Sequence, residues 1–341
     1  MARMNRQWIL KRRPEGDIAD GDLAFVETPV PATPDGHVLV RTLYLSLDPT
    51  NRIWMSDMDQ YMPPVEIGDV MRGGAVGVVE DSKDPNVPVG AIVAPMIGGW
   101  QDWHLLPGAM VRQIPQIPGL PVTAFMSVVG LTGWTAYFGL LDIGKPKAGE
   151  TVVVSAAAGA VGSIVGQIAK LKGARVVGIA GGPEKCRWIK DDLGFDAAID
   201  YKNEDVGAAL DKHCPDGIDV NFENVGGEIM DAILARMNNF SRMPLCGLIS
   251  TYNDTGERKG PSNFQQILMK RILVKGFIVI DYMSEFEKAS MELAQWVLEG
   301  RIKYKVHVEP GLENAAKAVK LLFNGRHDGK LLVGVTPEPS A

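Results

Sequence analysis

The chain has 341 residues, of which 46% are hydrophobic and 22% charged, and its formal net charge is −6. This length suits two domains, and the composition is that of a globular protein and excludes a disordered one. The negative charge argues against nucleic acid as a partner. The sequence contains neither a signal-peptide core nor an apolar run of about 18 residues, so no membrane span is expected. The cysteines have no paired spacing, which predicts free thiols and a cytoplasmic protein: Cys186, Cys214 and Cys246.

Residues 1 to about 125 are rich in short apolar runs that proline and glycine interrupt. Examples are HVLVRTLYLSL, GGAVGVVED and VGAIVAPMI. Such runs predict a β-rich, turn-rich domain, in the form of a partly closed barrel. Three prolines that lie close together mark a connection out of this domain: Pro115, Pro118 and Pro121.

Strands and helices alternate after this connection. The strand TVVVSAAA precedes the helix AVGSIVGQIAKLKG, and the strand ARVVGIAGG precedes the helix PEKCRWIKDDLG, which begins at Pro183 and ends at Gly194. Further strands are AAIDY, IDVNFENVG and MPLCGLIS, and further helices are GEIMDAILARM and SEFEKASMELAQWVLEG. The alternation predicts an α/β domain with a doubly wound parallel sheet of the Rossmann type. The last strand, KLLVGVTP, is expected to rejoin the first domain.

The sharpest motif is the turn AAAGAVG at residues 156–162. The dinucleotide-binding fingerprint is G-x-G-x-x-G, and Gly159 and Gly162 match its last two glycines, whereas Ala157 departs from the first. Small residues still let the backbone approach a pyrophosphate, and the helix that follows offers N–H groups and a positive dipole end. A tight strand–helix turn without a ligand is the alternative. The position of the turn, between a β-branched strand and an apolar helix, favours nucleotide binding.

The end of the second strand predicts NADPH in preference to NADH. A site for NAD places Asp or Glu about 20 residues after the fingerprint, at the adenosine ribose. Residues 178–182 read GIAGG and carry no acid, while Lys185 and Tyr201 follow and suit a 2′-phosphate. The alternative for Lys185 is an exposed lysine at a helix start, where the helix dipole disfavours a cation.

These segments together resemble the medium-chain dehydrogenase/reductase superfamily. The resemblance is to its zinc-free branch of prostaglandin reductases, leukotriene B4 dehydrogenase-like enzymes, plant alkenal double-bond reductases and bacterial curcumin reductase. It covers nearly the whole chain and rests on LSLDPTNR (45–52), MRGGAVGVV (71–79), GLTGWTAYFGLLDIG (130–144), AAAGAVGS (156–163), GGPEKCRWI (181–189), IDYK (199–202), FENVGGE (222–228), ISTYN (249–253) and KGFIV (275–279). The resemblance implies a GroES-like catalytic domain of residues 1–128 and 304–341, an inserted NADP-binding Rossmann domain of residues 129–303, and a homodimer.

The resemblance also implies roles for individual residues around the cofactor. The pyrophosphate turn comprises Ala158, Gly159, Ala160 and Val161; the 2′-phosphate partners are Lys185 and Tyr201; Asn224 contacts the ribose and nicotinamide side; the loop under the cofactor runs from Cys246 to Tyr252; and Phe277 and Val279 offer backbone partners to the carboxamide. Two positions depart from the family pattern. His327 stands where the family commonly has an asparagine that contacts the cofactor. Thr50-Asn51 replaces Tyr-Met, so that a tyrosine that often lines the substrate pocket is missing.

No zinc site is expected. All three cysteines lie in the predicted cofactor domain, and the chain has no Cys-x-x-Cys. His37 and His104 of the first domain have no cysteine or neighbouring histidine as a partner, whereas catalytic zinc usually takes three protein ligands. Without a Lewis acid, alcohol oxidation loses its usual means of stabilising an alkoxide.

The expected reaction is reduction of the carbon–carbon double bond of a small apolar enone or enal. A hydride from NADPH goes to the β-carbon, the enolate is stabilised, and a proton reaches the α-carbon. Tyr252 is the first candidate for the donor at the carbonyl oxygen, where negative charge develops; the alternative is a tyrosine packed for bulk at a strand end. Two other functions remain open, an NADPH quinone reductase on the same scaffold and a protein that binds NADPH without catalysis.

Overall fold

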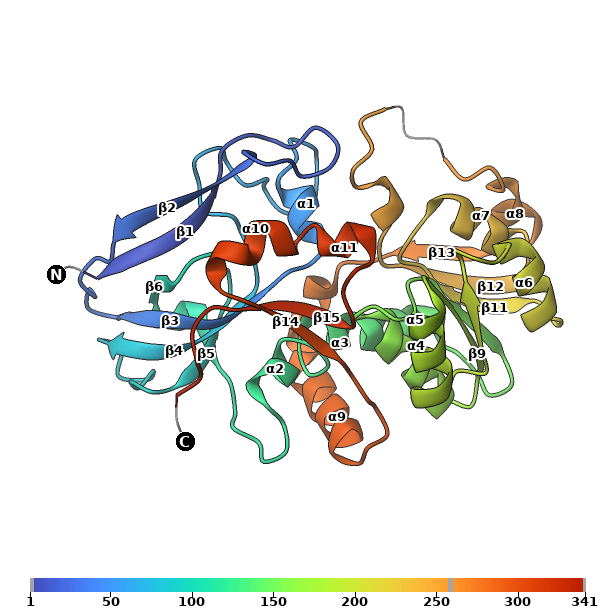
Figure 1. Cartoon of the computed structure of the whole chain (residues 1–341). Helices are drawn as coiled ribbons and strands as arrows, with labels where there is room; N and C mark the ends of the chain where they lie inside the picture. The colour runs from blue at the N-terminus through green and yellow to red at the C-terminus, as the bar shows by residue number, and fades with distance from the viewer. Residues whose placement is uncertain (1–2, 257–259, 340–341) are drawn as a thin grey trace. The chain divides into compact units, whose positions relative to one another are not determined.

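The structure is a computed structural model that describes residues 3–256 and 260–339 (Figure 1). Its chain divides into two compact units. Unit 1 comprises Met1–Met126, Val306–His327 and Leu331–Ala341, and unit 2 comprises Ser127–Lys305 and Asp328–Lys330. The predicted domain ranges also include residues 1–2, 257–259 and 340–341, which lie outside the described part of the chain.

Unit 1 is built on two β-sheets. β1 and β2 pair antiparallel, and a seven-stranded sheet runs in the order β14-β15-β3-β4-β5-β7, with β6 also paired to β3. β15 pairs antiparallel with β3 in the register Val333 to Leu45, which confirms that KLLVGVTP joins the first sheet. The strands are β1 (Met4–Leu10), β2 (Leu23–Pro29), β3 (His37–Ser46), β4 (Ala75–Ser82), β5 (Ile92–Pro95), β6 (Trp103–Pro107), β7 (Val111–Gln113), β14 (Val306–Pro310) and β15 (Lys330–Gly334).

The core of unit 1 follows from the apolar runs of its strands. β3 contributes Val38 and Val40 to one buried cluster and Leu45 to another, so this central strand is covered on both of its faces. The pairings described form an open path from β14 to β7, and closure of this sheet into a partial barrel stays a prediction. Short helical segments connect the strands: α1 (Thr50–Trp54), η1 (Gly108–Met110), α2 (Val122–Phe125), η6 (Leu312–Asn314), α10 (Ala315–Ala318) and α11 (Leu321–Asn324).

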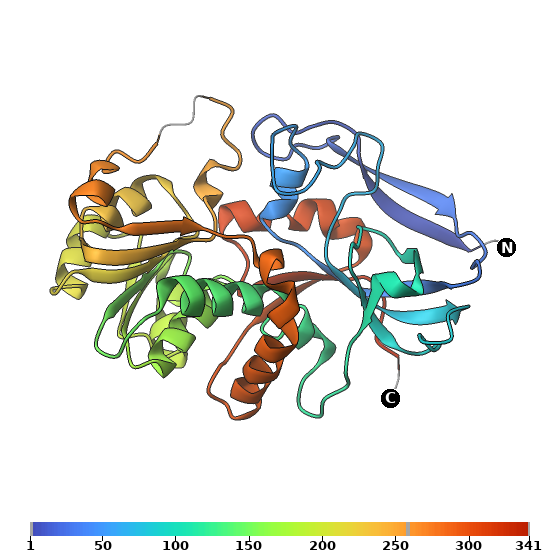
Figure 2. The ribbon, with the colours of Figure 1, turned by 180° about the vertical axis from the view of Figure 1, so that it is seen from behind.

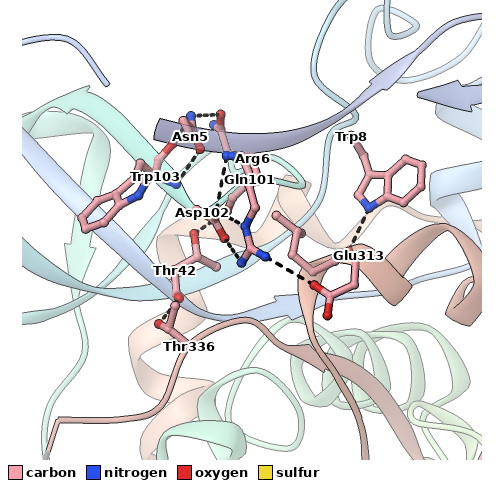
Figure 3. A network of polar contacts seen from close by, with 10 residues as sticks. Asn5, Arg6, Trp8, Thr42, Gln101, Asp102, Trp103, Glu313 and Thr336 are labelled. Carbon is pink, nitrogen blue, oxygen red and sulfur yellow. Dashed lines mark hydrogen bonds and ion pairs between the residues drawn. The ribbon is translucent and has the colours of Figure 1, made fainter. Parts of the chain in front are cut away.

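A polar network joins β1 to the segment that leads into β6 (Figure 3). Arg6 donates from Nε and Nη2 to the two oxygens of the buried Asp102, at 2.7 and 3.0 Å. A second carboxylate, that of Glu313, lies 3.5 Å from the same guanidinium, and the indole of Trp8 donates to the carbonyl of Leu312 at 2.8 Å. A bidentate charge-assisted pair is among the stronger side-chain contacts. The Arg6–Asp102 pair therefore ties β1 to the segment before β6, and so joins the two sheets of unit 1.

Unit 2 contains a parallel sheet of six strands in the order β10-β9-β8-β11-β12-β13. Numbered along the unit, this is the 3-2-1-4-5-6 order of a dinucleotide-binding Rossmann domain, so the doubly wound prediction is confirmed. The order reverses between β8 and β11, and ligands of such sheets bind outside the carboxyl ends of the strands at this switch point. The strands are β8 (Thr151–Val154), β9 (Arg175–Ala180), β10 (Ala197–Asp200), β11 (Ile218–Phe222), β12 (Met237–Leu245) and β13 (Leu273–Gly276).

Helices cover both faces of this sheet, as Figures 1 and 2 show. On one face, Val153 of β8 belongs to a buried cluster with residues of α6, α7 and α8. On the other face α4 packs closely, because a Cβ on Gly166 would lie 1.9 Å from the ring of Phe195. The helical segments are α3 (Leu131–Phe138), η2 (Gly139–Gly144), α4 (Gly162–Leu171), α5 (Pro183–Arg187), η3 (Trp188–Asp192), α6 (Val206–His213), α7 (Gly227–Leu234), η4 (Ile249–Thr251), α8 (Gln265–Met269), η5 (Val279–Glu285) and α9 (Phe286–Leu298).

The predicted strand MPLCGLIS is wrong at its carboxyl end, because β12 ends at Leu245. The amides of Cys246 and Gly247 both turn to the carbonyl of Glu223, at 2.9 and 3.2 Å, and the chain then enters the 3-10 turn η4. Tyr252 therefore follows a helical turn and does not lie at a strand end. Among the described residues, none of the helices combines the length and apolarity that spanning a membrane requires.

Candidate functional site

The turn between β8 and α4 is shaped by close backbone packing. Ala156 has a φ of +49°, and its carbonyl accepts from the amide of Gly159 at 2.9 Å. A Cβ on Gly162 would lie 2.4 Å from that same carbonyl oxygen, so only glycine lets α4 begin this close to the strand. Ala158 is buried, and the next three residues, Gly159, Ala160 and Val161, are partly exposed. The turn therefore presents a nearly bare backbone, which is what close approach of a pyrophosphate needs.

A segment from much later in the chain lies beside this turn. Gly329 forms a parallel bridge with Gly159, and the neighbouring Lys330 donates its amide to the carbonyl of Lys305 at 2.9 Å. Gly329 has a φ of +62°, and a Cβ there would lie 2.2 Å from the carbonyl oxygen of Lys305. Sequence reasoning used the segment GRHDGK only for His327 and missed Gly329. The signal was the second glycine of that segment, whose conformation excludes a side chain.

Two cations and a phenol gather at the end of β9. A Cβ on Gly181 would lie 2.8 Å from the ring of Tyr201 and 3.0 Å from the side chain of Lys202. Burial lowers the pKa of the half-buried Lys185, and the positive charge of Lys202 lowers it further, while Asp328 acts in the opposite direction. Two ammonium groups held near each other favour an anion between them. The structure thus places Lys185 and Tyr201 in one corner, together with Lys202, which sequence reasoning missed.

A buried acid beside this corner is held by its own loop. β9 ends at Ala180, and no acid follows it in the turn to α5. Asp200 lies at the end of the adjacent β10, buried, and accepts from the amides of Gly182 and Lys202 at 2.7 and 3.1 Å. Burial acts against ionisation, but hydrogen bonds from Asn203, Gly182 and Lys202 lower the pKa of Asp200 overall. Its carboxylate is therefore engaged with backbone amides, and sequence reasoning did not identify it.

The carboxyl ends of β8 and β11 are tied together at the switch point. Asn224 donates its amide to the hydroxyl of Ser155 at 2.8 Å and its side-chain Nδ2 to the carbonyl of Ser155 at 2.7 Å. Burial raises the pKa of the Cys246 thiol to about 12, and the carboxylate of Glu223 adds to this effect. A thiol with this pKa is protonated at neutral pH, so Cys246 lacks the thiolate character of a nucleophile.

Tyr252 lies on the loop that begins at Cys246. The amides of Ile249 and Ser250 donate to the carbonyls of Asn224 and Val225, at 3.1 and 3.0 Å. The hydroxyl of Tyr252 accepts from the amide of Leu248 at 3.2 Å. These bonds bring Tyr252 and Asn224 to the same end of the sheet.

Phe277 and Val279 follow β13. The ring of Phe277 packs edge-on against Phe222, with centroids 6.3 Å apart, and over Gly139, where a Cβ would lie 2.4 Å from the ring. Val279 is buried at the start of η5. Their roles toward a carboxamide stay predictions.

His327 belongs to unit 1, whereas the other predicted cofactor residues belong to unit 2. Its Nδ1 donates to the carbonyl of Leu321 at 3.0 Å. Its role toward a cofactor stays a prediction.

The Thr50-Asn51 pair has a structural explanation within unit 1. Asn51 is fully buried and accepts from the amide of Asp48 at 2.7 Å, while its Nδ2 donates to the carbonyl of Arg72 at 3.1 Å. The hydroxyl of Thr50 lies 2.7 Å from that of Tyr61. Within the described part of the chain, no group of three His, Cys, Asp or Glu side chains is arranged to hold a metal ion.

Comparison with known families matches both parts of the chain. Residues 6–114 match the family described as the N-terminal domain of oxidoreductase. Residues 160–296 match the family described as zinc-binding dehydrogenase.

Curated relatives match over nearly the full length. The chain is 44% identical to NADPH-dependent curcumin reductase of Escherichia coli (strain K12), over 97% of each chain. It is 41% identical to prostaglandin reductase 1 of Bos taurus, over 96% of this chain and 98% of that protein. It is 38% identical to the NADP(+)-dependent 2-alkenal reductase of Nicotiana tabacum, over 98% of each.

A solved structure shares the fold. The crystal structure of CurA in complex with NADPH from Vibrio vulnificus is 44% identical, covers 98% of this chain and 100% of its own, and has a TM-score of 0.93. The Rossmann strand order, the glycine-rich turn at the switch point and these full-length similarities agree. The chain belongs to the medium-chain dehydrogenase/reductase superfamily, in the branch of curcumin reductase, prostaglandin reductase 1 and 2-alkenal reductase.

Proposed function

We propose that this protein is an NADPH-dependent reductase of the carbon–carbon double bond of α,β-unsaturated ketones and aldehydes. The observation that carries this conclusion is the 44% identity to an NADPH-dependent curcumin reductase over 97% of each chain. A 2-alkenal reductase is similar over 98% of its length. The substrates named for these two relatives share a double bond conjugated to a carbonyl group, which defines the substrate class.

The geometry of unit 2 fits NADPH. Residues 158–161 are assigned to the pyrophosphate, and Gly162 supports this assignment because its lack of a Cβ lets α4 begin close to the turn. Lys185 and Tyr201, joined by Lys202, are assigned to the 2′-phosphate, which two ammonium groups and a phenol can bind. When bound there, NADPH supplies the hydride for the reduction. Because β9 ends without an acid, the adenosine ribose has no carboxylate partner of the kind that NAD sites use.

The remaining predicted residues are assigned to the nicotinamide end and to the substrate. Asn224 and Cys246, the backbone of Phe277 and Val279, and His327 are assigned to the nicotinamide side of the cofactor. Tyr252 is assigned to the substrate carbonyl oxygen, where a hydrogen-bond donor stabilises the negative charge that develops in the transition state. The α-carbon then receives its proton from Tyr252 or from water.

The test is a substrate panel monitored through loss of NADPH absorbance. A 2-alkenal, a long-chain enone, a curcumin-like dienone and a benzoquinone are compared, with NADH as the control cofactor. Fast turnover of an enone or enal with NADPH, and slow turnover with NADH, is the expected result. Turnover of the quinone alone would replace the proposal with a quinone reductase. Tight NADPH binding without turnover of any substrate would leave only a binding protein.

The division of roles between the chain segments is part of the proposal. Residues 129–303 are assigned as the NADP-binding domain, and residues 1–128 with 304–341 as the catalytic domain. Hydrogen exchange measured with and without NADPH tests this assignment. Protection is expected first in residues 156–163 and 181–202, and protection confined to residues 1–128 would contradict it.

We also propose a homodimer that uses the edge of the unit 2 sheet. β13 is the last strand of that sheet, and Leu273 on it is 52% exposed. Neighbouring apolar side chains are exposed as well: Phe264, Leu268 and Met269. An apolar sheet edge of this kind favours association with another chain. Light scattering on the parent and on Leu273→Lys tests the proposal: a dimer that the variant dissociates supports it, and a monomeric parent contradicts it.

The expected location is the cytoplasm, and the three cysteines support it because all are free thiols in the structure. Cell fractionation with an antibody against the protein tests this location, and recovery in an extracytoplasmic fraction would contradict it.

A further inference from the structure

Glu223 is a fully buried carboxylate directly after β11, and the proposed reaction leaves it without a role. Its Oε1 accepts from the hydroxyl of Ser155 at 3.0 Å and from the amides of Val225 and Gly226 at 2.7 and 2.8 Å. Its Oε2 accepts from the Nδ2 of Asn221 at 2.7 Å. Burial raises the pKa of Glu223, and these four donors act against that rise. Burying a carboxylate is costly, so a position that keeps one has a use for its several acceptor sites.

The first connection from Glu223 leads to the nucleotide turn. Ser155 is the residue between β8 and the turn at residues 156–162, and its hydroxyl donates to Glu223 while accepting from the amide of Asn224. A single hydroxyl therefore joins the carboxylate to both loops that border the switch point. Loss of either partner leaves a buried polar group without its hydrogen bond.

The second connection leads to the loop that carries Tyr252. The carbonyl of Glu223 accepts from the amides of Cys246 and Gly247, where β12 ends. The amides of Val225 and Gly226 are bound by the carboxylate itself, and the carbonyl of Val225 accepts from the amide of Ser250. The path of residues 246–252 thus depends on the turn that the carboxylate of Glu223 holds.

We infer that Glu223 is a positioning residue that holds the nucleotide turn and the Tyr252 loop in one register, so that both meet the same bound cofactor. This inference rests on the proposed function, because it takes NADPH as the ligand of the turn. Glu223 contacts neither substrate nor cofactor in this role. It acts through Ser155 on one side and through Val225 and Gly226 on the other.

The test uses Glu223→Ala, Glu223→Gln and Ser155→Ala in the full-length protein. The alanine at position 223 removes all four acceptor contacts, and Ser155→Ala removes only the shared hydroxyl. The glutamine keeps one oxygen for three of the donors and turns an amide toward Asn221. That amide gains an acceptor once the side chain of Asn221 turns over, because the Oδ1 of Asn221 is buried and has no hydrogen-bond partner among the described residues.

The matched control is Glu150→Gln at the opposite end of β8. Glu150 also pairs with polar groups of neighbouring segments, accepting from Arg242 at 2.6 Å and from the amide of Lys147 at 2.9 Å. Its loss is expected to lower the melting temperature without changing the dissociation constant for NADPH. This comparison separates positioning of the cofactor from general stability.

The dissociation constant for NADPH is measured from the change in NADPH fluorescence on binding, in the absence of substrate. Glu223→Ala and Ser155→Ala are expected to raise it about tenfold, since each leaves buried polar groups unpaired, and Glu223→Gln is expected to stay within about threefold of the parent. At saturating NADPH, Glu223→Ala is also expected to lower kcat, because the Tyr252 loop shifts. Ser155→Ala is expected mainly to raise the KM for NADPH.

Circular dichroism checks that each variant folds. If Glu223→Ala does not fold, NADPH binding by Ser155→Ala and Glu223→Gln tests the inference. Parent-like NADPH binding by Ser155→Ala would overturn the inference, as would an equal loss of binding in Glu150→Gln. A glutamine variant as weak as the alanine variant would overturn the acceptor role. A parent that does not bind NADPH would overturn the proposed function and this inference with it.

Discussion

His104 is a buried histidine whose titration provides a quantitative test of unit 1. Its Nε2 accepts from the amide of Gly99 at 3.0 Å, so the proton of the neutral ring lies on Nδ1. Nδ1 lies 3.2 Å from the hydroxyl of Thr42, which itself donates to the carbonyl of Gln101 at 2.7 Å. A second ring proton would therefore meet the Gly99 amide, a donor. Burial lowers the pKa of His104 from 6.5 to about 4.

The sign of the pH effect follows from this lowered pKa. Between pH 6.5 and pH 4 the unfolded chain binds a proton that the folded protein does not, so the free energy of unfolding falls as the pH falls. The full difference corresponds to roughly 3 kcal/mol. About 2 kcal/mol of this is lost between about pH 7 and about pH 5.

The assay compares the parent with His104→Gln. Glutamine can accept from Gly99 and donate toward Thr42, but it does not titrate. Urea unfolding followed by tryptophan fluorescence is expected to show that the parent loses about 2 kcal/mol more than the variant between about pH 7 and about pH 5. In proton NMR, the His104 C2 resonance is expected to stay unchanged down to about pH 5. Equal losses in the two proteins, or a His104 midpoint near the ordinary value, would refute the reasoning.

Four further substitutions test the cofactor and substrate assignments. Lys185→Ala and Lys202→Ala are each expected to raise KM for NADPH about tenfold while leaving KM for NADH unchanged, because only NADPH carries the 2′-phosphate; equal changes for the two cofactors in steady-state kinetics would contradict this. Gly162→Ala is expected to weaken NADPH binding and to lower the free energy of unfolding by about 1–3 kcal/mol, since its Cβ would lie 2.4 Å from a backbone oxygen; parent-like values in binding and urea titrations would count against it. Tyr252→Phe is expected to lower kcat about 100- to 1,000-fold with an unchanged dissociation constant for NADPH, and an unchanged kcat would remove Tyr252 from the catalytic role.

The parts of the fold that local sequence determines were predictable. The helical stretch formed by α5 and η3 begins at Pro183, whose ring favours a helix start, and Gly194 follows its end with a φ of +73°. The strand at residues 151–154 is a continuous β-branched run, as a strand buried on both faces requires. Gly162 lets α4 pack close to the turn, and the sequence order of strand, turn and helix already predicted this need for a glycine.

The parts that depend on distant partners were not predictable. β12 ends at Leu245 because the next amides find the carbonyl of Glu223, and nothing in the local pattern indicates that partner. Glu223 itself reads as an ordinary surface acid in the sequence, since its burial comes from the packing of β8 against β11. Lys202 lies near Gly181 only because β9 and β10 end side by side, with Ala180 opposite Asp200.

The bridge between Gly159 and Gly329 has a consequence for the order of synthesis. The two glycines are separated by 329 − 159 = 170 residues, so the ribosome completes the six-stranded sheet and α9 before it makes the partner of the nucleotide turn. Domains generally fold as units during synthesis. Unit 2 is expected to form its sheet early and to gain its final turn geometry late. A nascent chain halted after Lys305 would then hold a nearly complete nucleotide domain that lacks the last segment beside its own phosphate turn.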